Sequence, residues 1–246
     1  MTDYAVRITR LNYSYPDGTR ALENIDCDVA AGERVALVGP SGAGKSTLLL
    51  HLNGILRGPG TIRIMGTTIA EGDLRVIRKQ VGIVFQDPND QLFCPTVFED
   101  VAFGPLNLGI PPGEIGRRVE KALIDVRLDH SYASRSAHHL SHGERKRVAM
   151  ASVLVMEPAI LALDEPSSNL DPGNRRHLIE LIAALPVTLI LGTHDLEMVL
   201  ELCPRTVVMD RGKIQADGET SRLLADSFLM AKHNLEVPLS LRGRRG

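Results

Sequence analysis

The stretch from residue 39 to residue 47, GPSGAGKST, has the composition of a loop that binds phosphate groups. Its glycines let the backbone curl so that successive N–H groups point at phosphate oxygens. Lys45 supplies a positive charge for β- and γ-phosphates, and Ser46 supplies a hydroxyl for Mg²⁺. The loop matches the pattern GxxxxGK[ST], so every position is a candidate nucleotide contact: Gly39, Pro40, Ser41, Gly42, Ala43, Gly44, Lys45, Ser46 and Thr47.

Two carboxylates follow another apolar stretch, ILALDE, at residues 160–165. A buried strand would deliver Asp164 to its carboxyl end, where the carboxylate could hold Mg²⁺ directly or through water. Glu165, one residue further, could face an attacking water as general base, a role that contributes about 10²–10⁴-fold in rate. Alone, such a pair is simply a solvated strand end. Its place downstream of a phosphate loop favours the catalytic interpretation.

Two further polar residues end apolar stretches. Gln86 ends VGIVFQ and His194 ends LILGTH. Ligand sites of open α/β sheets gather at the carboxyl ends of the strands. Gln86 could therefore contribute to Mg²⁺ binding and orient water, and His194 could donate a hydrogen bond to the γ-phosphate. Taken singly, each residue could equally be a capping or turn residue.

These candidates require short strands that alternate with helices. The loop lies between an apolar strand and an apolar helix, which gives a strand, a glycine loop and a helix in succession. A hairpin with its turn at Arg211 and Gly212 follows the last predicted strand. The predicted strands cover residues 4–15, 21–33, 34–39, 60–69, 81–86, 159–166, 187–195 and 206–214, and the predicted helices cover 48–56, most of 96–156, and 175–185.

Short apolar strands followed by helices predict an α/β fold with a mainly parallel sheet covered on both faces. The first strands predict a small antiparallel side sheet at the N-terminus. The central helical block looks like an insertion into the domain that contains the parallel sheet. We therefore expect one domain over residues 1–246. Its core would cover about 1–86 and 157–220, its helical subdomain about 87–156, and a C-terminal extension about 221–246.

Composition limits the classes of function. The 246 residues carry a net charge of −2, which argues against a nucleic-acid partner, because such a partner favours a basic surface. The three cysteines, Cys27, Cys94 and Cys203, lie far apart without a CxxC, which indicates reduced thiols in a cytosolic protein. The start lacks the apolar core of a signal peptide, and no apolar run approaches the roughly 18 residues of a membrane span. Any work at a membrane would need a partner.

In this order, these residues resemble the ATP-binding cassette (ABC) family over nearly the whole chain. The resemblance implies the ABC ATPase fold, with a P-loop NTPase core, and ATP and Mg²⁺ as ligands. It identifies LSHGE, residues 140–144, as the signature that usually reads LSGGQ. Ser141 and the N–H of Gly143 would bind the γ-phosphate of ATP held by another subunit. A second cassette, most simply an identical copy arranged head to tail, would complete each site.

The signature departs from the family pattern at two positions. His142 replaces a glycine and could restrict the backbone. Glu144 replaces a glutamine and is also a candidate nucleotide contact, although its charge would oppose phosphate unless it points away or caps the helix. By the same resemblance Tyr15 would stack on adenine, with Tyr13 as the nearby competitor. Asp171 would contact the phosphate loop of the opposite subunit.

A narrower resemblance concerns residues 85–93 (FQDPNDQLF) and 100–109 (DVAFGPLNLG). They look like the ATPases of energy-coupling factor transporters of the cobalt and nickel type, as do residues 223–238 at the C-terminal end. This implies ATP-driven import with two membrane partners: a transmembrane coupling subunit and a substrate-binding subunit. The coupling subunit would enter a groove after Gln86 and meet Asp87 and Asp90. The chain would then lie peripherally on the cytoplasmic face of the cell membrane.

Other functions fit less well. The nearest alternative is the ATPase subunit of an ordinary ABC transporter, and a soluble ABC ATPase without a transport role is a more distant one. Soluble cassettes of DNA repair carry a long coiled coil or zinc modules, and here neither sustained heptads nor a CxxC is present. A GTPase would need an NKxD motif to read its base. The narrower resemblance implies that a membrane subunit, and not this chain, selects the transported substrate.

Overall fold

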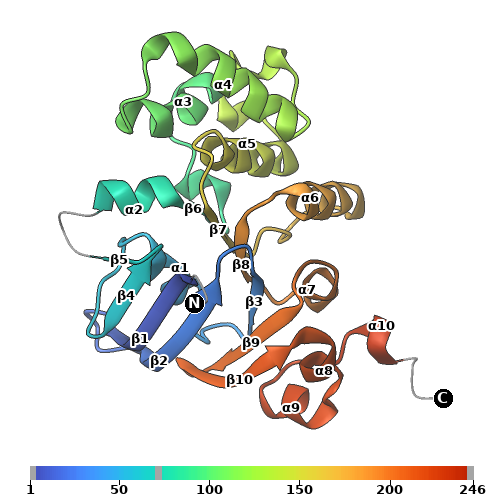
Figure 1. Ribbon diagram of the computed structural model, residues 1–246. Helices are drawn as coiled ribbons and strands as arrows, with labels where there is room; N and C mark the ends of the chain where they lie inside the picture. Colours follow the sequence, from blue (N-terminus) through green and yellow to red (C-terminus); the bar gives the residue numbers. More distant parts are fainter. Residues whose placement is uncertain (1–3, 70–73, 243–246) are drawn as a thin grey trace.

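The structure, a computed structural model, describes residues 4–69 and 74–242 and contains two sheets (Figure 1). The smaller sheet has the strand order β2-β1-β4-β5 and is antiparallel throughout. Its four strands are β1 (Tyr4–Ser14), β2 (Arg20–Ala30), β4 (Thr61–Ile64) and β5 (Thr67–Thr68).

The larger sheet has the order β10-β9-β3-β8-β7-β6, and every pairing in it is parallel except that of β10 with β9. A parallel sheet buried on both faces needs uninterrupted apolar strands, which explains why β7 and β8 are buried at every position. The six strands are β3 (Arg34–Val38), β6 (Val81–Val84), β7 (Ile160–Asp164), β8 (Thr188–Gly192), β9 (Arg205–Asp210) and β10 (Lys213–Glu219).

The two faces of this sheet belong to different cores. Ile160 and Ala162 of β7 join the core that contains the small sheet and α1 (Lys45–Leu52), so α1 lies between the two sheets. Leu161 and Leu163, on the alternate face, join the core built with the other helices. Burying one such leucine contributes about 1.5–3 kcal/mol to stability. Because the residues of β7 alternate between the two cores, this strand stabilises the packing on both faces of the sheet.

A block of helices stands at one end of the larger sheet (Figure 1). It contains α3 (Val97–Asn107), α4 (Pro112–Asp125) and α5 (His142–Leu154), which pack on one another. Thr96 and Glu99 form a reciprocal capping box at the start of α3. Three short 3₁₀ segments flank these helices: η2 (Pro88–Asp90), η3 (His130–Tyr132) and η4 (Ala137–His139).

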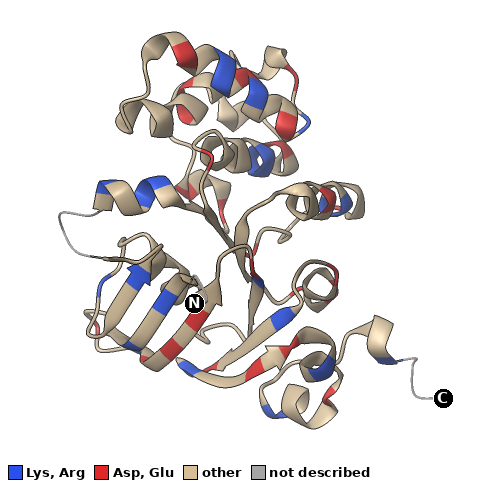
Figure 2. Ribbon diagram, in the orientation of Figure 1, with Lys and Arg blue, Asp and Glu red and all other residues tan. Residues whose placement is uncertain are grey.

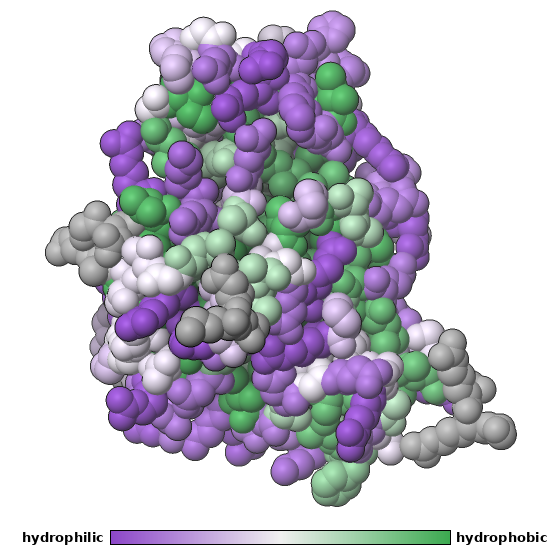
Figure 3. All heavy atoms as spheres, in the orientation of Figure 1, coloured by the Kyte–Doolittle hydropathy of each residue, from purple (hydrophilic) through white to green (hydrophobic). Residues whose placement is uncertain are grey.

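The remaining helices cover the larger sheet and the C-terminal end. They are α2 (Leu74–Gln80), α6 (Pro172–Ala184), α7 (Leu196–Leu202), α8 (Thr220–Ala225), α9 (Ser227–Lys232) and α10 (Leu239–Arg242). Lys and Arg alternate with Asp and Glu over the molecule instead of collecting on one side (Figure 2). On the face drawn in Figure 3, hydrophilic residues dominate the outline, and hydrophobic ones lie between the helical block and the sheets.

The predicted fold class is confirmed, and the hairpin turns at Arg211 and Gly212 as expected. Five short helices, α2, α7, α8, α9 and α10, were not predicted, because each has seven residues or fewer and too few turns to show a period. β6 ends at Val84, so Gln86 lies two residues beyond the strand. The subdomain boundaries stay a prediction, and positions 1–3, 70–73 and 243–246 of the predicted domain lie outside the described residues.

The helices of residues 4–69 and 74–242 are all too short or too polar to cross a membrane.

The burial of the cysteines predicts an order of thiol reactivity. Burial raises the pKa of Cys27 to about 11 and that of Cys203 to about 12, so few thiolates form at these positions at pH 8. The pKa of Cys94 is also raised, first by burial and then by Asp100, but this residue is only half-buried. We expect a thiol reagent at pH 8 to label Cys94 slowly in the native protein and all three thiols in denaturant. Native labelling of Cys203 first would contradict the described packing.

Candidate nucleotide site

The phosphate loop joins β3 to α1 and depends on glycine at two positions. A Cβ on Gly39 would lie 2.1 Å from the carbonyl oxygen of Met209, which no side chain tolerates. Gly44 has a φ of 102° and precedes α1 without a side-chain cap. The first intrahelical hydrogen bond runs from the N–H of Leu48 to Gly44 O, so the N–H groups of the first helical turn have no intrahelical acceptor. N–H groups of this kind can bind an anion.

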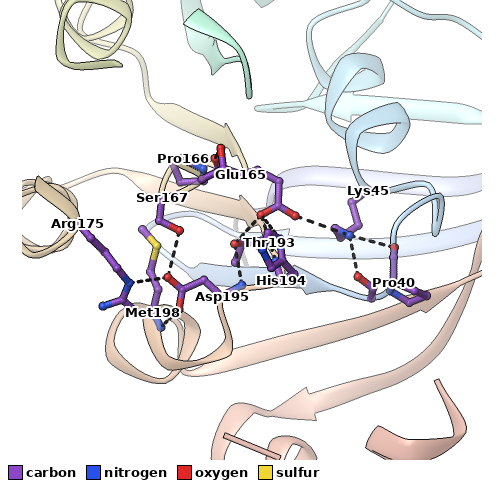
Figure 4. Close-up of polar contacts among 12 residues, drawn as sticks. Pro40, Lys45, Glu165, Pro166, Ser167, Arg175, Thr193, His194, Asp195 and Met198 are labelled. Atoms are coloured by element: carbon purple, nitrogen blue, oxygen red, sulfur yellow. Dashed lines mark hydrogen bonds and ion pairs between the residues drawn. The ribbon is translucent and has the colours of Figure 1, made fainter. Parts of the chain in front are cut away.

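Lys45 is buried inside this loop. Its Nζ donates to the carbonyl oxygens of Gly39 at 2.7 Å and Pro40 at 3.2 Å, and it lies 3.9 Å from Glu165 Oε1 (Figure 4). Burial lowers the pKa of the ammonium group, while the carboxylates of Glu165 and Asp164 oppose that change. The loop therefore carries a buried positive charge beside two carboxylates, where β- and γ-phosphates would add negative charge.

Asp164 is the last residue of β7, and its buried Oδ1 has no hydrogen-bond partner within residues 4–69 and 74–242. Burial raises the pKa of this carboxyl group, opposed by a hydrogen bond from Ser46 and assisted by the charge of Glu165. An orphaned carboxylate oxygen next to a hydroxyl is a donor set that suits Mg²⁺. The neighbouring strand β6 leads to Gln86, which is exposed and could add a carbonyl oxygen.

Glu165 follows Asp164 in the left-handed backbone region, with a φ of 43°. Its N–H donates to Gly192 O at 2.7 Å. One carboxylate oxygen, Oε2, accepts from Thr193 Oγ1 at 2.9 Å and from His194 N at 3.2 Å, and His194 Nδ1 lies 2.8 Å away (Figure 4). The structure thus brings Glu165 and His194 together, from the ends of two neighbouring parallel strands. An oriented carboxylate of this kind can accept a proton from water.

Asp195 anchors the loop that carries His194. Its carboxylate accepts two hydrogen bonds from Arg175 of α6, at 2.7 Å from Nε and 2.8 Å from Nη2, and one from Ser167 Oγ at 3.1 Å (Figure 4). Burial alone would raise the pKa of Asp195, but the hydrogen bonds from Arg175 hold it below its ordinary value. The segments after Glu165 and after Thr193 are therefore fixed to one another.

Tyr15 lies next to the phosphate loop, because its hydroxyl is 3.0 Å from Thr47 Oγ1. Tyr13 packs edge-on against Tyr15, with ring centroids 5.1 Å apart, and against His51 of α1 at 4.8 Å. Tyr13 is thus used in the packing of the small sheet on α1. Tyr15, which is partly exposed, keeps a ring that can accept a base.

The signature residues lie at the start of α5. Ser141 is the N-cap, and its Oγ accepts from the N–H of Glu144 at 3.3 Å. The Glu144 carboxylate accepts in return from Ser141 N at 2.8 Å and from the hydroxyl of Tyr132 at 2.7 Å. These hydrogen bonds, with that from Tyr132 first, lower the pKa of Glu144 to about 2. Of the alternatives stated for Glu144, the structure shows the helix cap.

Gly143 and Asp171 both lie next to Asn174 of α6. A Cβ on Gly143 would lie 3.0 Å from Nδ2 of Asn174. Asp171 caps α6 and accepts from the N–H of Asn174 at 2.9 Å. Neither residue, nor Ser141 or Glu144, hydrogen-bonds to the phosphate loop within the described chain. The loop, Asp164, Glu165 and His194 therefore lie together, while Ser141, Gly143, Glu144 and Asp171 make no hydrogen bond to them among the described residues.

Four residues that hold this arrangement were not singled out from the sequence: Lys146, Arg175, Thr193 and Asp195. Thr193 and Asp195 flank His194, so a search for polar neighbours of a candidate would have found them. Lys146 and Arg175 look like ordinary surface charges on helices. Only their tertiary contacts distinguish them.

Comparison with known proteins fits this geometry. A family model described as ABC transporter matches residues 22–168. A putative ABC transporter ATP-binding protein of Streptomyces avermitilis is 53% identical over 238 residues, which cover 96% of this chain and 90% of that protein. The energy-coupling factor transporter ATP-binding protein EcfA of Methanothermobacter thermautotrophicus is 45% identical over 239 residues, 95% of this chain and 76% of that protein.

A solved structure extends the likeness to three dimensions. CbiO1 of Clostridium perfringens, described as part of the ABC transporter complex CbiONQ, superimposes with a TM-score of 0.80 and 39% identity over 98% of each chain. The phosphate loop, the strand-end carboxylates and these relatives lead to one conclusion. The chain belongs to the ABC transporter family, as an ATP-hydrolysing subunit.

Proposed function

We propose that this ATPase powers import through a membrane transporter of the energy-coupling factor type, with cobalt or nickel ions as the substrate. The observation that carries the proposal is the likeness to CbiO1 over 98% of both chains. The similarity to EcfA supports the same transporter type. The name of the Streptomyces relative is less specific, and an ordinary ABC transporter subunit is the alternative.

The phosphate loop, the general base and the metal ligands of each site would come from one chain. The N–H groups of the phosphate loop and Lys45 bind the β- and γ-phosphates, and Tyr15 stacks on adenine. Thr193 and His194 hold the Glu165 carboxylate in position, and this carboxylate accepts a proton from the attacking water. His194 is largely exposed, with 70% of its side chain accessible, and can therefore reach the γ-phosphate.

Ser46, Asp164 and Gln86 would hold Mg²⁺, since the first two bring oxygen atoms together and the third lies at the next strand end. The ion would supply charge neutralisation on the phosphates. The protein residues would fix where that neutralisation occurs.

A second copy would complete the site. Ser141 is exposed at the start of α5, and Gly143 lies beside it. In a head-to-tail homodimer, these residues bind the γ-phosphate on the partner subunit, and Asp171 meets the partner subunit's phosphate loop. Glu144 serves this function by capping α5, which leaves the Ser141 hydroxyl proton available.

A groove beside α2, β6 and α3 is the proposed docking site for the transmembrane coupling subunit. Phe93 and Phe103 stand edge-on there, with ring centroids 5.0 Å apart, and are 64% and 49% exposed. Exposed aromatic rings in a groove suit an amphipathic helix. Asp90 and Arg78 also line the groove and supply polar contacts. The chain then lies on the cytoplasmic face of the membrane, and a separate membrane subunit selects the substrate.

Mass spectrometry of proteins that co-purify with the tagged chain from gently solubilised native membranes tests this function. We expect a transmembrane coupling subunit and a substrate-binding membrane subunit. Phe93→Asp should lose both, because a charge would enter the apolar contact. Ile124→Asp, at another exposed apolar residue of the helical block, should keep both. A conventional permease would support the alternative, and soluble partners alone would exclude transport.

Glu165→Gln tests the general base. We expect the rate of ATP hydrolysis to fall about 10²–10⁴-fold, since an amide cannot accept the proton, while ATP affinity is kept. The measurements are steady-state phosphate release and equilibrium nucleotide binding. Glu120→Gln, at an exposed carboxylate of α4, serves as the control. An unchanged rate in Glu165→Gln would remove the base assignment.

Asp164→Asn tests the metal site. The variant removes a buried charge whose Oδ1 has no partner, so the free energy of unfolding without ligand should rise by about 1 kcal/mol. Adding ATP with Mg²⁺ at 100-fold its Kd should stabilise the wild type by about 2.7 kcal/mol. The variant should lose the part that depends on Mg²⁺. Thermal unfolding with ATP, with and without the metal, would reveal an unchanged Mg²⁺ effect if the assignment is wrong.

A further inference from the structure

Lys146 connects the signature helix to the backbone of Glu165. Its Nζ donates to the carbonyl oxygens of Glu165 at 3.1 Å and Pro166 at 3.0 Å, and to Ser168 Oγ at 2.8 Å. Ser168 Oγ donates in turn to Glu165 O at 2.9 Å. The ammonium group has three protons, so these three acceptors use its full capacity.

The segment that Lys146 holds has an unusual backbone. Glu165 is a non-glycine residue in the left-handed region, which persists only where surrounding contacts enforce it. The N–H of Glu165 is fixed by Gly192, and its carbonyl oxygen is fixed by Lys146. One of the two constraints therefore comes from the larger sheet and the other from α5.

The link between α5 and Glu165 is hard to break, because Lys146 is a buried charge. Only 8% of its surface is exposed, so water cannot readily replace the three acceptors. On one side a largely apolar cavity between α5 and α6 is lined by Met150, Leu178 and Leu181. An ammonium group that left the carbonyl oxygens for such a surface would lose its hydrogen bonds. A shift of α5 should therefore carry the Glu165 backbone with it.

Ser141 caps the N-terminus of the same helix, five residues before Lys146. Under the proposed function, on which this inference rests, Ser141 contacts the ATP of the partner subunit, while Glu165 acts on the ATP of its own chain. We propose that Lys146 is a positioning residue that transmits engagement of the signature by one ATP to the general base of the other site. The two hydrolytic sites of the dimer would then act cooperatively through α5.

The test uses the full-length chain and compares Lys146→Met with Lys121→Met, an exposed lysine of α4. We measure ATP hydrolysis against ATP concentration. The wild type and Lys121→Met should show a Hill coefficient above 1. In Lys146→Met we expect a Hill coefficient near 1 and a kcat about tenfold lower, because Lys146 no longer holds the backbone of the general base Glu165 in position. The Kd for ATP should not change.

Two further variants separate positioning from folding. Ser168→Ala removes one acceptor at the other end of the link and should shift the Hill coefficient in the same direction. Lys146→Met in a Glu165→Gln background should still dimerise with ATP, as measured by light scattering. Dimerisation that fails only with Lys146→Met, or an unchanged Hill coefficient and kcat, would overturn the role of Lys146. A wild type that neither dimerises nor hydrolyses ATP would overturn the proposed function itself.

Discussion

Three charged side chains, those of Lys45, Asp164 and Glu165, are buried within one small region at the carboxyl ends of the parallel strands. Charges in such a place are costly unless their geometry is tightly controlled. Much of the rest of the structure provides that control. β7 delivers both carboxylates, the loop after β3 folds its carbonyl oxygens around Lys45, and the end of β8 supplies donors to Glu165. Both faces of the sheet are packed, so these strand ends keep their positions.

Some polar groups of this region have all their hydrogen-bond partners and others do not, and this difference suits the binding of phosphate. Glu165 has donors from Thr193 and His194, and Asp195 has the paired hydrogen bonds of Arg175. Among the described residues, Asp164 Oδ1 has no hydrogen-bond partner, and the N–H groups of the first turn of α1 have no intrahelical acceptor. The satisfied groups fix the geometry, and the unsatisfied ones are those that a metal ion and an anion would complete.

The sequence predicts the strands, the phosphate loop and the strand-end carboxylates well, because each depends on local pattern. The run ILAL before Asp164 is apolar at every position, and a loop such as GPSGAGKST needs its glycines where it turns. Lys146 and Arg175 could not be found this way. Lys146 reaches residues 19 to 22 positions later, and Arg175 pairs with Asp195 across 20 residues. Such pairings depend on how α5 and α6 pack on the sheet. The local hydrophobic periodicity of a sequence does not contain this information.

At position 144, where the family usually has glutamine, the sequence suggests a conflict that the structure does not contain. A negative charge in a phosphate-binding signature looks unfavourable when only the sequence is considered. In the structure the carboxylate turns back onto Ser141 N and Tyr132, where the helix N-terminus and a hydroxyl stabilise it. Ser141 Oγ accepts from Glu144 N in the same cap, but its own proton is not consumed by that bond. A capped signature can therefore still donate to an anion, so the cap and the proposed role of Ser141 in the second site are compatible.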